Sequence, residues 1–388
     1  MDRRNFLSHG MLAAGGLSLA ACKSASAQSP GPGEKKPPMK YRTLGRTGLV
    51  VSEVAFGTYG WQNTAVLVKA LEAGVSLICT CADYQSGGAE RAVGLAIKGR
   101  REREKVCLLS GIDCLRDPGE SEMLERLEAS LERLGTGWLD IYVPHQAETL
   151  ANVTNPAIPK AFEKMKAKGK ARWLGISTHS GQLEPMLERA IDLGYYDVLL
   201  CRYNFMEYKS QMKIFARAAE AGIGVIVFKV HAGTRESELE PLQQKGLDLD
   251  QARMRWALSN PNVTSTCVHF TNFSAIDNYL EAINTETSLR DADLLEQYRT
   301  AFDHSYCRNC SACEHYCPHG VKVADIQRFG MYFRCYGFEK EAMARYAALP
   351  AAGRAGFCRN CPAPCESGCP YGLAIRRHLL EAHAMLTA

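Results

Sequence analysis

The sequence lacks several features that would assign it to a common class. Its 388 residues carry a formal net charge of only +4, and no basic run is interleaved with aromatic residues, so a nucleic-acid partner is not expected. No apolar run is long and glycine-poor enough for a stable membrane span. The composition, 46% hydrophobic and 23% charged, is typical of a globular chain with one large domain and one small domain.

Cysteine is the residue type in excess. The chain has 16 cysteines, more than a reduced cytosolic enzyme usually needs, and it is too long for a small disulfide scaffold. The spacing of the cysteines must therefore indicate their role.

The first residues are predicted to be a targeting segment. Arg3 and Arg4 precede a short run rich in alanine and glycine, a pattern typical of a twin-arginine export signal over residues 1–21. That route carries folded proteins, often with cofactors already inserted. The protein is therefore expected outside the cytoplasm.

The signal ends in LAAC, which resembles a lipoprotein processing box. This predicts lipidation of Cys22 and a membrane attachment by the lipid anchor only, with cleavage near Ala25–Ala27 as the alternative that would release a periplasmic protein. Residues 22–38 are rich in Ser, Pro, Gly and Lys, so we predict a disordered linker there.

Residues 39–298 show alternating strand-like and helix-like segments. Eight continuously apolar segments indicate parallel strands buried on both faces, and amphipathic helices lie between them. The strand candidates are VSEVAFGT, SLICTCADY, KVCLLSGI, LDIYVPHQ, ARWLGISTH, YDVLLCRYN, GVIVFKVHA and VTSTCVHF. Eight such units predict an α/β fold, a closed (β/α)₈ TIM barrel. An open doubly wound sheet is the alternative, but no GxGxxG turn follows the first strand.

Two helix candidates are clear. ESEMLERLEASLERLG is amphipathic, and QMKIFARAAEAG places Ile214, Phe215 and Ala218 on one face and stops at Gly222.

Chemistry in such a barrel lies where the strands end. The residues at these ends include several tyrosines and histidines and one lysine. They are Tyr84, Gly111 to Asp113, His145, Thr178, His179, Arg202, Tyr203, Lys229, His231 and His269. Such side chains suit proton transfer to a carbonyl or hydroxyl group.

Five segments between residues 41 and 283 resemble the aldo-keto reductase family. They are RTLGRTGLVVSEVAFGTYG, DYQSGGAERAVG, LDIYVPHQ, GKARWLGISTH and RYNFM. The resemblance implies carbonyl reduction with NADPH through a Tyr, a His, an Asp and a Lys. Tyr84 takes the position of the proton-donating Tyr and His145 that of the His, but the Asp position is Cys79 and the Lys position is Gly111.

These departures matter because a tyrosine without a nearby cation titrates near 10 and is a slow acid at neutral pH. Lys229, at the end of the seventh strand, is a possible surrogate charge. Its alternatives are a solvated loop residue or a binder of an anionic substrate. Cys79 itself is expected to be a small buried residue.

The nucleotide site that the resemblance implies is also altered. Tyr203 matches the aromatic residue that stacks on the nicotinamide, and Thr271 and Asn272 match a polar pair at the phosphate. Three other positions depart from the family pattern: Leu200, His269 and Ala275. The departures weaken the expectation of bound NADP(H).

Residues 299–388 contain two cysteine motifs, CxxCxxCxxxCP and CxxCxxxCxxxCP. Three close thiolates and a fourth before proline are typical of a [4Fe–4S] cluster, and in two-cluster ferredoxins the fourth cysteine binds the other cluster. One predicted set is Cys307, Cys310, Cys313 and Cys369, and the other is Cys358, Cys361, Cys365 and Cys317. Cysteine-bound zinc is the alternative.

This tail resembles a bacterial-type ferredoxin domain, and the segment between its motifs is expected to be helical with a structural Cys335. Together the features predict an exported iron–sulfur oxidoreductase of the aldo-keto reductase type. Two [4Fe–4S] clusters would pass electrons between a redox protein partner and a small carbonyl or alcohol substrate. An electron-transfer or binding subunit with a degenerate barrel, and an NADPH-dependent carbonyl reductase, are the alternatives.

Overall fold

The computed structural model describes residues 37–60, 63–98, 101–206, 209–232 and 248–388. The predicted export signal, Cys22 and most of the predicted linker lie outside the described residues.

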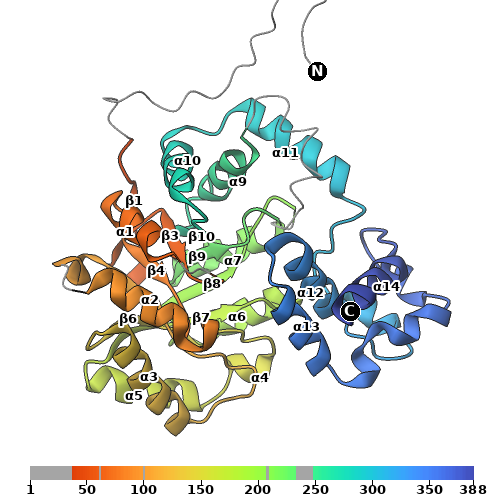
Figure 1. Ribbon diagram of the computed structural model, residues 1–388, viewed down its shortest axis with the longest axis horizontal. Helices are drawn as coiled ribbons and strands as arrows, with labels where there is room; N and C mark the ends of the chain where they lie inside the picture. The colour runs from red at the N-terminus through yellow and green to blue at the C-terminus, as the bar shows by residue number, and fades with distance from the viewer. Residues whose placement is uncertain (1–36, 61–62, 99–100, 207–208, 233–247) are drawn as a thin grey trace, which may run out of the picture. The chain divides into compact units, whose positions relative to one another are not determined.

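Eight parallel strands close into a barrel in the order β10-β3-β4-β5-β6-β7-β8-β9 (Figure 1). They are β3 Val54–Gly57, β4 Leu77–Cys79, β5 Cys107–Ser110, β6 Leu139–Tyr142, β7 Ala171–Thr178, β8 Val198–Arg202, β9 Gly224–Phe228 and β10 Ser265–Val268. Each lies within one of the eight predicted segments, so the prediction of a (β/α)₈ barrel is confirmed. We call the end of the barrel where the carboxyl ends of these strands meet the barrel mouth.

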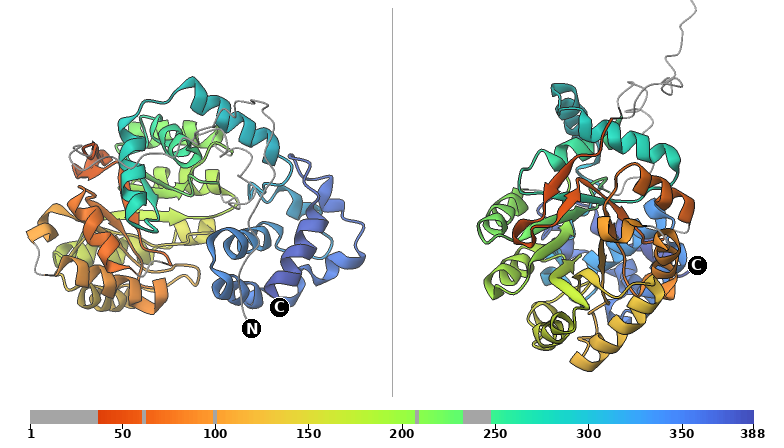
Figure 2. Two further views of the ribbon diagram at one scale, coloured as in Figure 1. Left: turned by 45° about the horizontal axis from the view of Figure 1, so that its top comes forward. Right: turned by 90° about the vertical axis from the view of Figure 1, so that its left-hand side faces the viewer.

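Helices surround the strands (Figure 2). They are α1 Thr64–Glu72, α2 Gly88–Ile97, α3 Glu120–Leu134, α4 Leu150–Val153, α5 Ala157–Ala167, α6 Leu183–Leu193, α7 Lys209–Glu220, α9 Leu249–Leu258, α10 Phe273–Asn284 and α11 Leu289–Phe302. Both helices predicted from amphipathic patterns are present as α3 and α7. Ile214, Phe215 and Ala218 of α7 are buried as predicted.

The strands are apolar on both faces because each face packs against its own layer. Residues inside the barrel, among them Leu77, Leu109 and Ile226, form one apolar cluster. Residues such as Ile78 and Leu108 form a second cluster with the surrounding helices. Residues one position apart therefore belong to different layers, as strand geometry requires.

An antiparallel hairpin of β1 Tyr41–Thr43 and β2 Val50–Ser52 precedes the barrel. Leu44, which is fully buried, lies between the two strands and contacts Gly224, where an added Cβ would come within 2.5 Å of the leucine. The hairpin therefore packs where β9 begins, at the end opposite the barrel mouth.

The segment after α11, which we call the tail, contains α12 Val323–Tyr336, α13 Glu339–Ala348 and α14 Ile375–Leu386. The predicted helical insert is two helices, because α12 ends at Gly337, whose φ of 68° is left-handed. The tail has an apolar cluster of its own, distinct from those of the barrel. In the described part of the chain, every helix is too short or too polar to cross a membrane.

Candidate functional site: two thiol-lined hollows beside a barrel mouth

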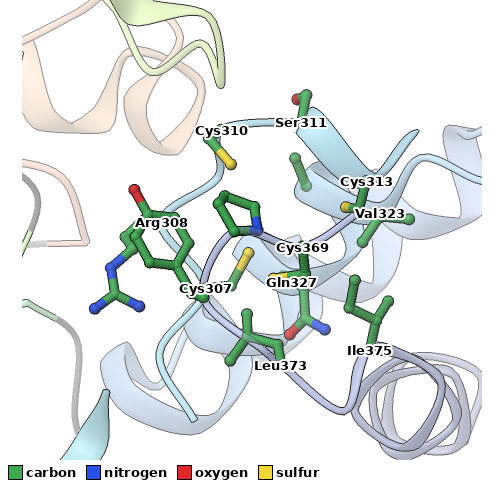
Figure 3. A pocket seen from close by; sticks show the side chains of 13 residues that line it. Cys307, Arg308, Cys310, Ser311, Cys313, Val323, Gln327, Cys369, Leu373 and Ile375 are labelled. Atoms are coloured by element: carbon green, nitrogen blue, oxygen red, sulfur yellow. The ribbon is translucent and has the colours of Figure 1, made fainter. Parts of the chain in front are cut away.

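Four cysteines of the tail surround one hollow, which we call the first hollow. Figure 3 shows their sulfur atoms facing it from two distant stretches of chain. The hollow contains about 360 Å³ of space, and its cysteines are Cys307, Cys310, Cys313 and Cys369. The fourth cysteine of the second motif thus lies with the first three of the first motif.

The remaining four motif cysteines surround a second hollow of about 310 Å³. They are Cys317, Cys358, Cys361 and Cys365. Val323, the first residue of α12, lines both hollows, so the two are neighbours. The structure therefore brings together the same two sets of four thiols that the motifs and the two-cluster ferredoxin rule predict.

The loops that carry the cysteines have an unusual backbone. Asn309 and Ser311 in the first loop, and Ala363 in the second, have φ between 52° and 59°, the left-handed region that side chains other than glycine seldom adopt. Alternating right- and left-handed residues turn backbone N–H groups towards a concave site, a geometry found at many iron–sulfur centres.

Two backbone N–H groups already donate to motif thiols. The amide of Asn309 is 3.4 Å from Cys307 Sγ, and the amide of Val321 is 3.3 Å from Cys317 Sγ. Such bonds stabilise a thiolate and tune the cluster that it holds.

The thiols within each set act on one another. Burial raises the pKa of Cys313, and Cys307, Cys310 and Cys369 are among the groups that raise it further. Four thiolates so close together need a positive centre to offset their repulsion. Among the described residues, no three His, Cys, Asp or Glu side chains converge as a site for a single metal ion; the thiols instead surround hollows.

Tyr84 and His145, predicted as the catalytic pair, both lie at the barrel mouth. Their ring centroids are 6.0 Å apart, and the ring of Tyr59 packs edge-on against Tyr84 at 4.9 Å. Burial raises the pKa of Tyr84 well above its usual value, and the groups that add to this effect are thiols and the phenol of Tyr59. Tyr84 therefore has the surroundings of a weak acid.

His145 is neutral at physiological pH because burial lowers its pKa to about 4. One ring nitrogen bonds the backbone of Thr80, while Nε2 is buried without a hydrogen-bond partner. A neutral imidazole with an open nitrogen can orient an oxygen-bearing ligand.

The two departures from the family pattern have structural causes. A Cβ added at Gly111 would lie 1.7 Å from the carbonyl oxygen of Val143, so this backbone leaves no space for any side chain. Cys79 lies inside the barrel, where a hydrogen bond with the thiol of Cys267, together with burial, raises its pKa. It is a neutral thiol and carries no charge that could replace a carboxylate.

Lys229 pairs with the tail. Its Nζ donates to the phenolic oxygen of Tyr332 in α12 at 3.1 Å and lies 4.8 Å from the centre of that ring. Sequence reasoning placed Lys229 at the mouth but missed Tyr332, which is 103 residues away. The only signal in the sequence was a helix unusually rich in aromatic residues, MYFRCYGF.

Three further tail residues bind the loops of the mouth. Arg328 of α12 forms an ion pair with Glu148 at 3.1 Å and donates to the carbonyl of His179. Arg345 of α13 donates to Gln146 at 2.7 Å. Phe338 packs edge-on against Tyr59, with ring centroids 4.5 Å apart. The tail therefore reaches the residues at the ends of several barrel strands.

The first cysteine loop also touches the barrel. Arg202, at the end of β8, donates to the carbonyl of Arg308 at 3.1 Å. A Cβ added at Gly181 would come within 2.2 Å of the carbonyl oxygen of Asn309. Only glycine allows the cysteine loop to approach this closely.

The residues predicted to bind a nucleotide differ in their exposure. Tyr203 is almost fully buried and stacks on Trp256 at 4.7 Å, with Phe215 beside it, so little of its ring is open to a nicotinamide. Thr271 and Asn272 are exposed, and Asn272 caps the N-terminus of α10, a position suited to phosphate.

Comparison with known proteins gives a consistent result for the barrel. Residues 55–241 match the profile described as "Aldo/keto reductase family". The chain is 25% identical over 321 residues, 68% of this chain and 96% of the other, to "Uncharacterized oxidoreductase YrpG" of Bacillus subtilis. It is 40% identical over 115 residues, 30% of this chain and 38% of the other, to "Methylglyoxal reductase YeaE" of Escherichia coli.

Among solved structures, an aldo-keto reductase from Klebsiella pneumoniae in complex with NADPH matches with a TM-score of 0.56 and 23% identity. The match covers 67% of this chain and 95% of the other. At this identity it supports the fold.

Proposed function

Since residues 55–241 match the profile of the aldo/keto reductase family, we propose that the protein is an iron–sulfur oxidoreductase of this type. Two [4Fe–4S] clusters, one in each hollow, would pass electrons to or from a small carbonyl or alcohol substrate in the barrel mouth. Hydride transfer from a nicotinamide is replaced in this proposal by single-electron transfer.

One observation carries the proposal: eight motif thiols surround two neighbouring hollows, and the loop of the first hollow lies against the barrel. Thiolates are the ligands of [4Fe–4S] clusters, and N–H···S bonds and left-handed loop residues suit such clusters. The second hollow adjoins the first at Val323, and the loop of the first hollow contacts Gly181 and Arg202 of the barrel. Bound clusters would supply electrons one at a time.

The electron balance is compatible with this route. Reducing a carbonyl to an alcohol takes two electrons and two protons, and two reduced clusters hold one transferable electron each. A redox protein partner is needed to refill them. We propose that such a partner meets the protein outside the cytoplasm, because the amino-terminal arginine pair suggests export and Cys22 a lipid anchor.

Anaerobic purification with iron and sulfide analysis tests the cofactor. We expect about eight iron and eight sulfide per chain and an EPR signal on reduction. Cys313→Ser should lose about half of the iron, whereas Cys335→Ser, the matched change outside both hollows, should keep all of it. Colourless protein that holds zinc would refute the proposal.

Turnover tests the reaction. Reduction of simple aldehydes and ketones with an artificial one-electron donor should proceed without NADPH and should fail in Cys313→Ser. If the clusters are reduced but no carbonyl is consumed, an electron-transfer or binding subunit is the better description.

One observation favours the electron-transfer or binding subunit. Tyr332 and Phe338 of the tail contact Lys229 and Tyr59 at the barrel mouth. In that function the barrel would serve as a docking platform. The third, an NADPH-dependent reductase, is tested by titrating NADPH against tryptophan fluorescence. Saturable binding at micromolar NADPH would favour it, because the NADPH complex of the Klebsiella relative has the same fold.

A further inference from the structure

We propose that Tyr332 of the tail, and not Tyr84 of the barrel, is the acid that gives a proton to the substrate oxygen, and that Lys229 is its positioning residue. The inference rests on the proposed function and names the group that carries its proton transfer. It means that the tail completes the barrel site as well as holding the predicted clusters.

The geometry of the pair is specific. Lys229 Nζ lies 3.1 Å from the phenolic oxygen of Tyr332. Lys229 directly follows the last residue of β9. Its φ of 57° lies in the left-handed region, so the chain turns away from the strand direction at this residue. Tyr332 is 8% exposed, which leaves the hydroxyl few partners other than this lysine.

The charges around Tyr332 come from three elements. Lys229 follows β9, Arg328 is on α12 and Arg345 is on α13, and all three lower the pKa of Tyr332 against the opposing effect of burial. The other titratable groups that face the phenol are Tyr59 and Tyr336. The pKa of Lys229 is also lowered, first by burial, so the two groups can share a proton.

None of the three cations that act on Tyr332 is among the groups that shift the pKa of Tyr84. The groups that act on it are Cys81, Cys267, Tyr59 and Cys79, and each raises its pKa. Of Tyr84 and Tyr332, Tyr332 is therefore the better acid at neutral pH.

The surrounding polar atoms suit a ligand with oxygen. Two buried ring nitrogens lack a hydrogen-bond partner: His145 Nε2 and His179 Nδ1. The pKa of His179 is lowered by Lys229 and, when it is protonated, by His145, and the pKa of Tyr59 is raised by Tyr332, so these groups lie close together. A carbonyl or hydroxyl group placed there would satisfy atoms that are otherwise costly to bury.

Clusters held by the motif thiols would supply the two electrons that the reduction of a carbonyl needs. As the C=O π bond breaks, the oxygen takes the proton of Tyr332 and the carbon takes a proton from solvent. The products are the alcohol and the Tyr332 phenolate, which the Lys229 ammonium stabilises until water restores its proton.

A tyrosine ionisation measurement tests the pair without relying on turnover. In ultraviolet difference titration of the anaerobic holoprotein, we expect one phenol to ionise below the ordinary value near 10. The component should be absent in Tyr332→Phe and move to higher pH in Lys229→Met. Tyr336→Phe, one helical turn further along α12, is the matched control and should retain it. A Tyr332→Phe titration identical to that of the wild type would overturn the inference.

Turnover separates this inference from the function on which it rests. Tyr332→Phe should lower the rate of carbonyl reduction at least about 100-fold, the usual lower bound for losing a general acid, while the control Tyr336→Phe stays within about threefold. If the wild type is active and Tyr332→Phe is equally active, the role of Tyr332 is refuted and the proposed function stands. A wild type with intact clusters and no turnover would refute the proposed function itself.

Discussion

The barrel and the tail bury different kinds of side chain. The barrel has two concentric apolar layers of aliphatic and aromatic residues, one inside the strands and one under the helices. The apolar cluster of the tail is smaller, and six motif cysteines are buried in it or packed against it. They are Cys307, Cys313, Cys317, Cys358, Cys365 and Cys369.

The two regions therefore have different requirements for folding. The barrel can fold on hydrophobic burial alone, because its layers are complete without any bound group. The tail brings repelling thiols together around hollows, so we expect its folding to depend on the group that fills them, as in other small metal-binding domains. The chain offers separate probes: all four tryptophans precede residue 299, and cluster absorbance would report on the tail alone.

Removal of the proposed clusters should have the strongest effect. Chelation under mild oxidation should abolish the visible absorbance and the hydrogen-exchange protection of α12, α13 and α14. The tryptophan-detected unfolding of the barrel should persist as a cooperative transition. A tail that keeps its protection without iron would break the comparison.

An intermediate effect is expected where the two regions meet. Arg328 and Glu148 have side chains only 10% and 13% exposed, and removing one member of a buried ion pair costs about 3–5 kcal/mol. Arg328→Met should therefore lower the free energy of opening of α12 by about that amount, measured by native-state hydrogen exchange.

The control for this change is Arg377→Met on α14, since that arginine is 69% exposed and its ion pair with Glu381 is long, at 3.8 Å. Exposed pairs contribute less than about 1 kcal/mol. Equal losses in the two variants would mean that the contact between tail and barrel is unimportant for the order of the tail.

The sequence predicted the parts of the molecule that depend on local pattern. Buried parallel strands are continuously apolar, so all eight could be located. The two cysteine motifs, read with the pairing rule of two-cluster ferredoxins, grouped the thiols as the structure does. The β1–β2 hairpin was missed because its strands are only three residues each.

Long-range contacts could not be predicted in this way. From the sequence, Gly111 is interpreted only as a missing lysine. In the structure no side chain fits there, because the carbonyl of Val143, directly after the neighbouring strand β6, is too close. Lys229 could be named as a candidate cation, whereas its partner Tyr332 is set by how the tail packs on the mouth, which no spacing rule describes.

The smallest expected effect compares the same change in both regions. Gly135 ends α3 in the barrel with a φ of 64°, and Gly337 ends α12 in the tail with a φ of 68°; at both, an added Cβ would meet nothing within 4 Å. Alanine at either position should therefore cost only the left-handed backbone strain, about 1 kcal/mol. Gly135→Ala should shift the tryptophan-detected urea midpoint, and Gly337→Ala should instead shift the loss of cluster absorbance. If Gly337→Ala moves the tryptophan transition as far as Gly135→Ala does, the barrel and the tail unfold as one unit, and the separation between an apolar region and a cluster-dependent region would have to be given up.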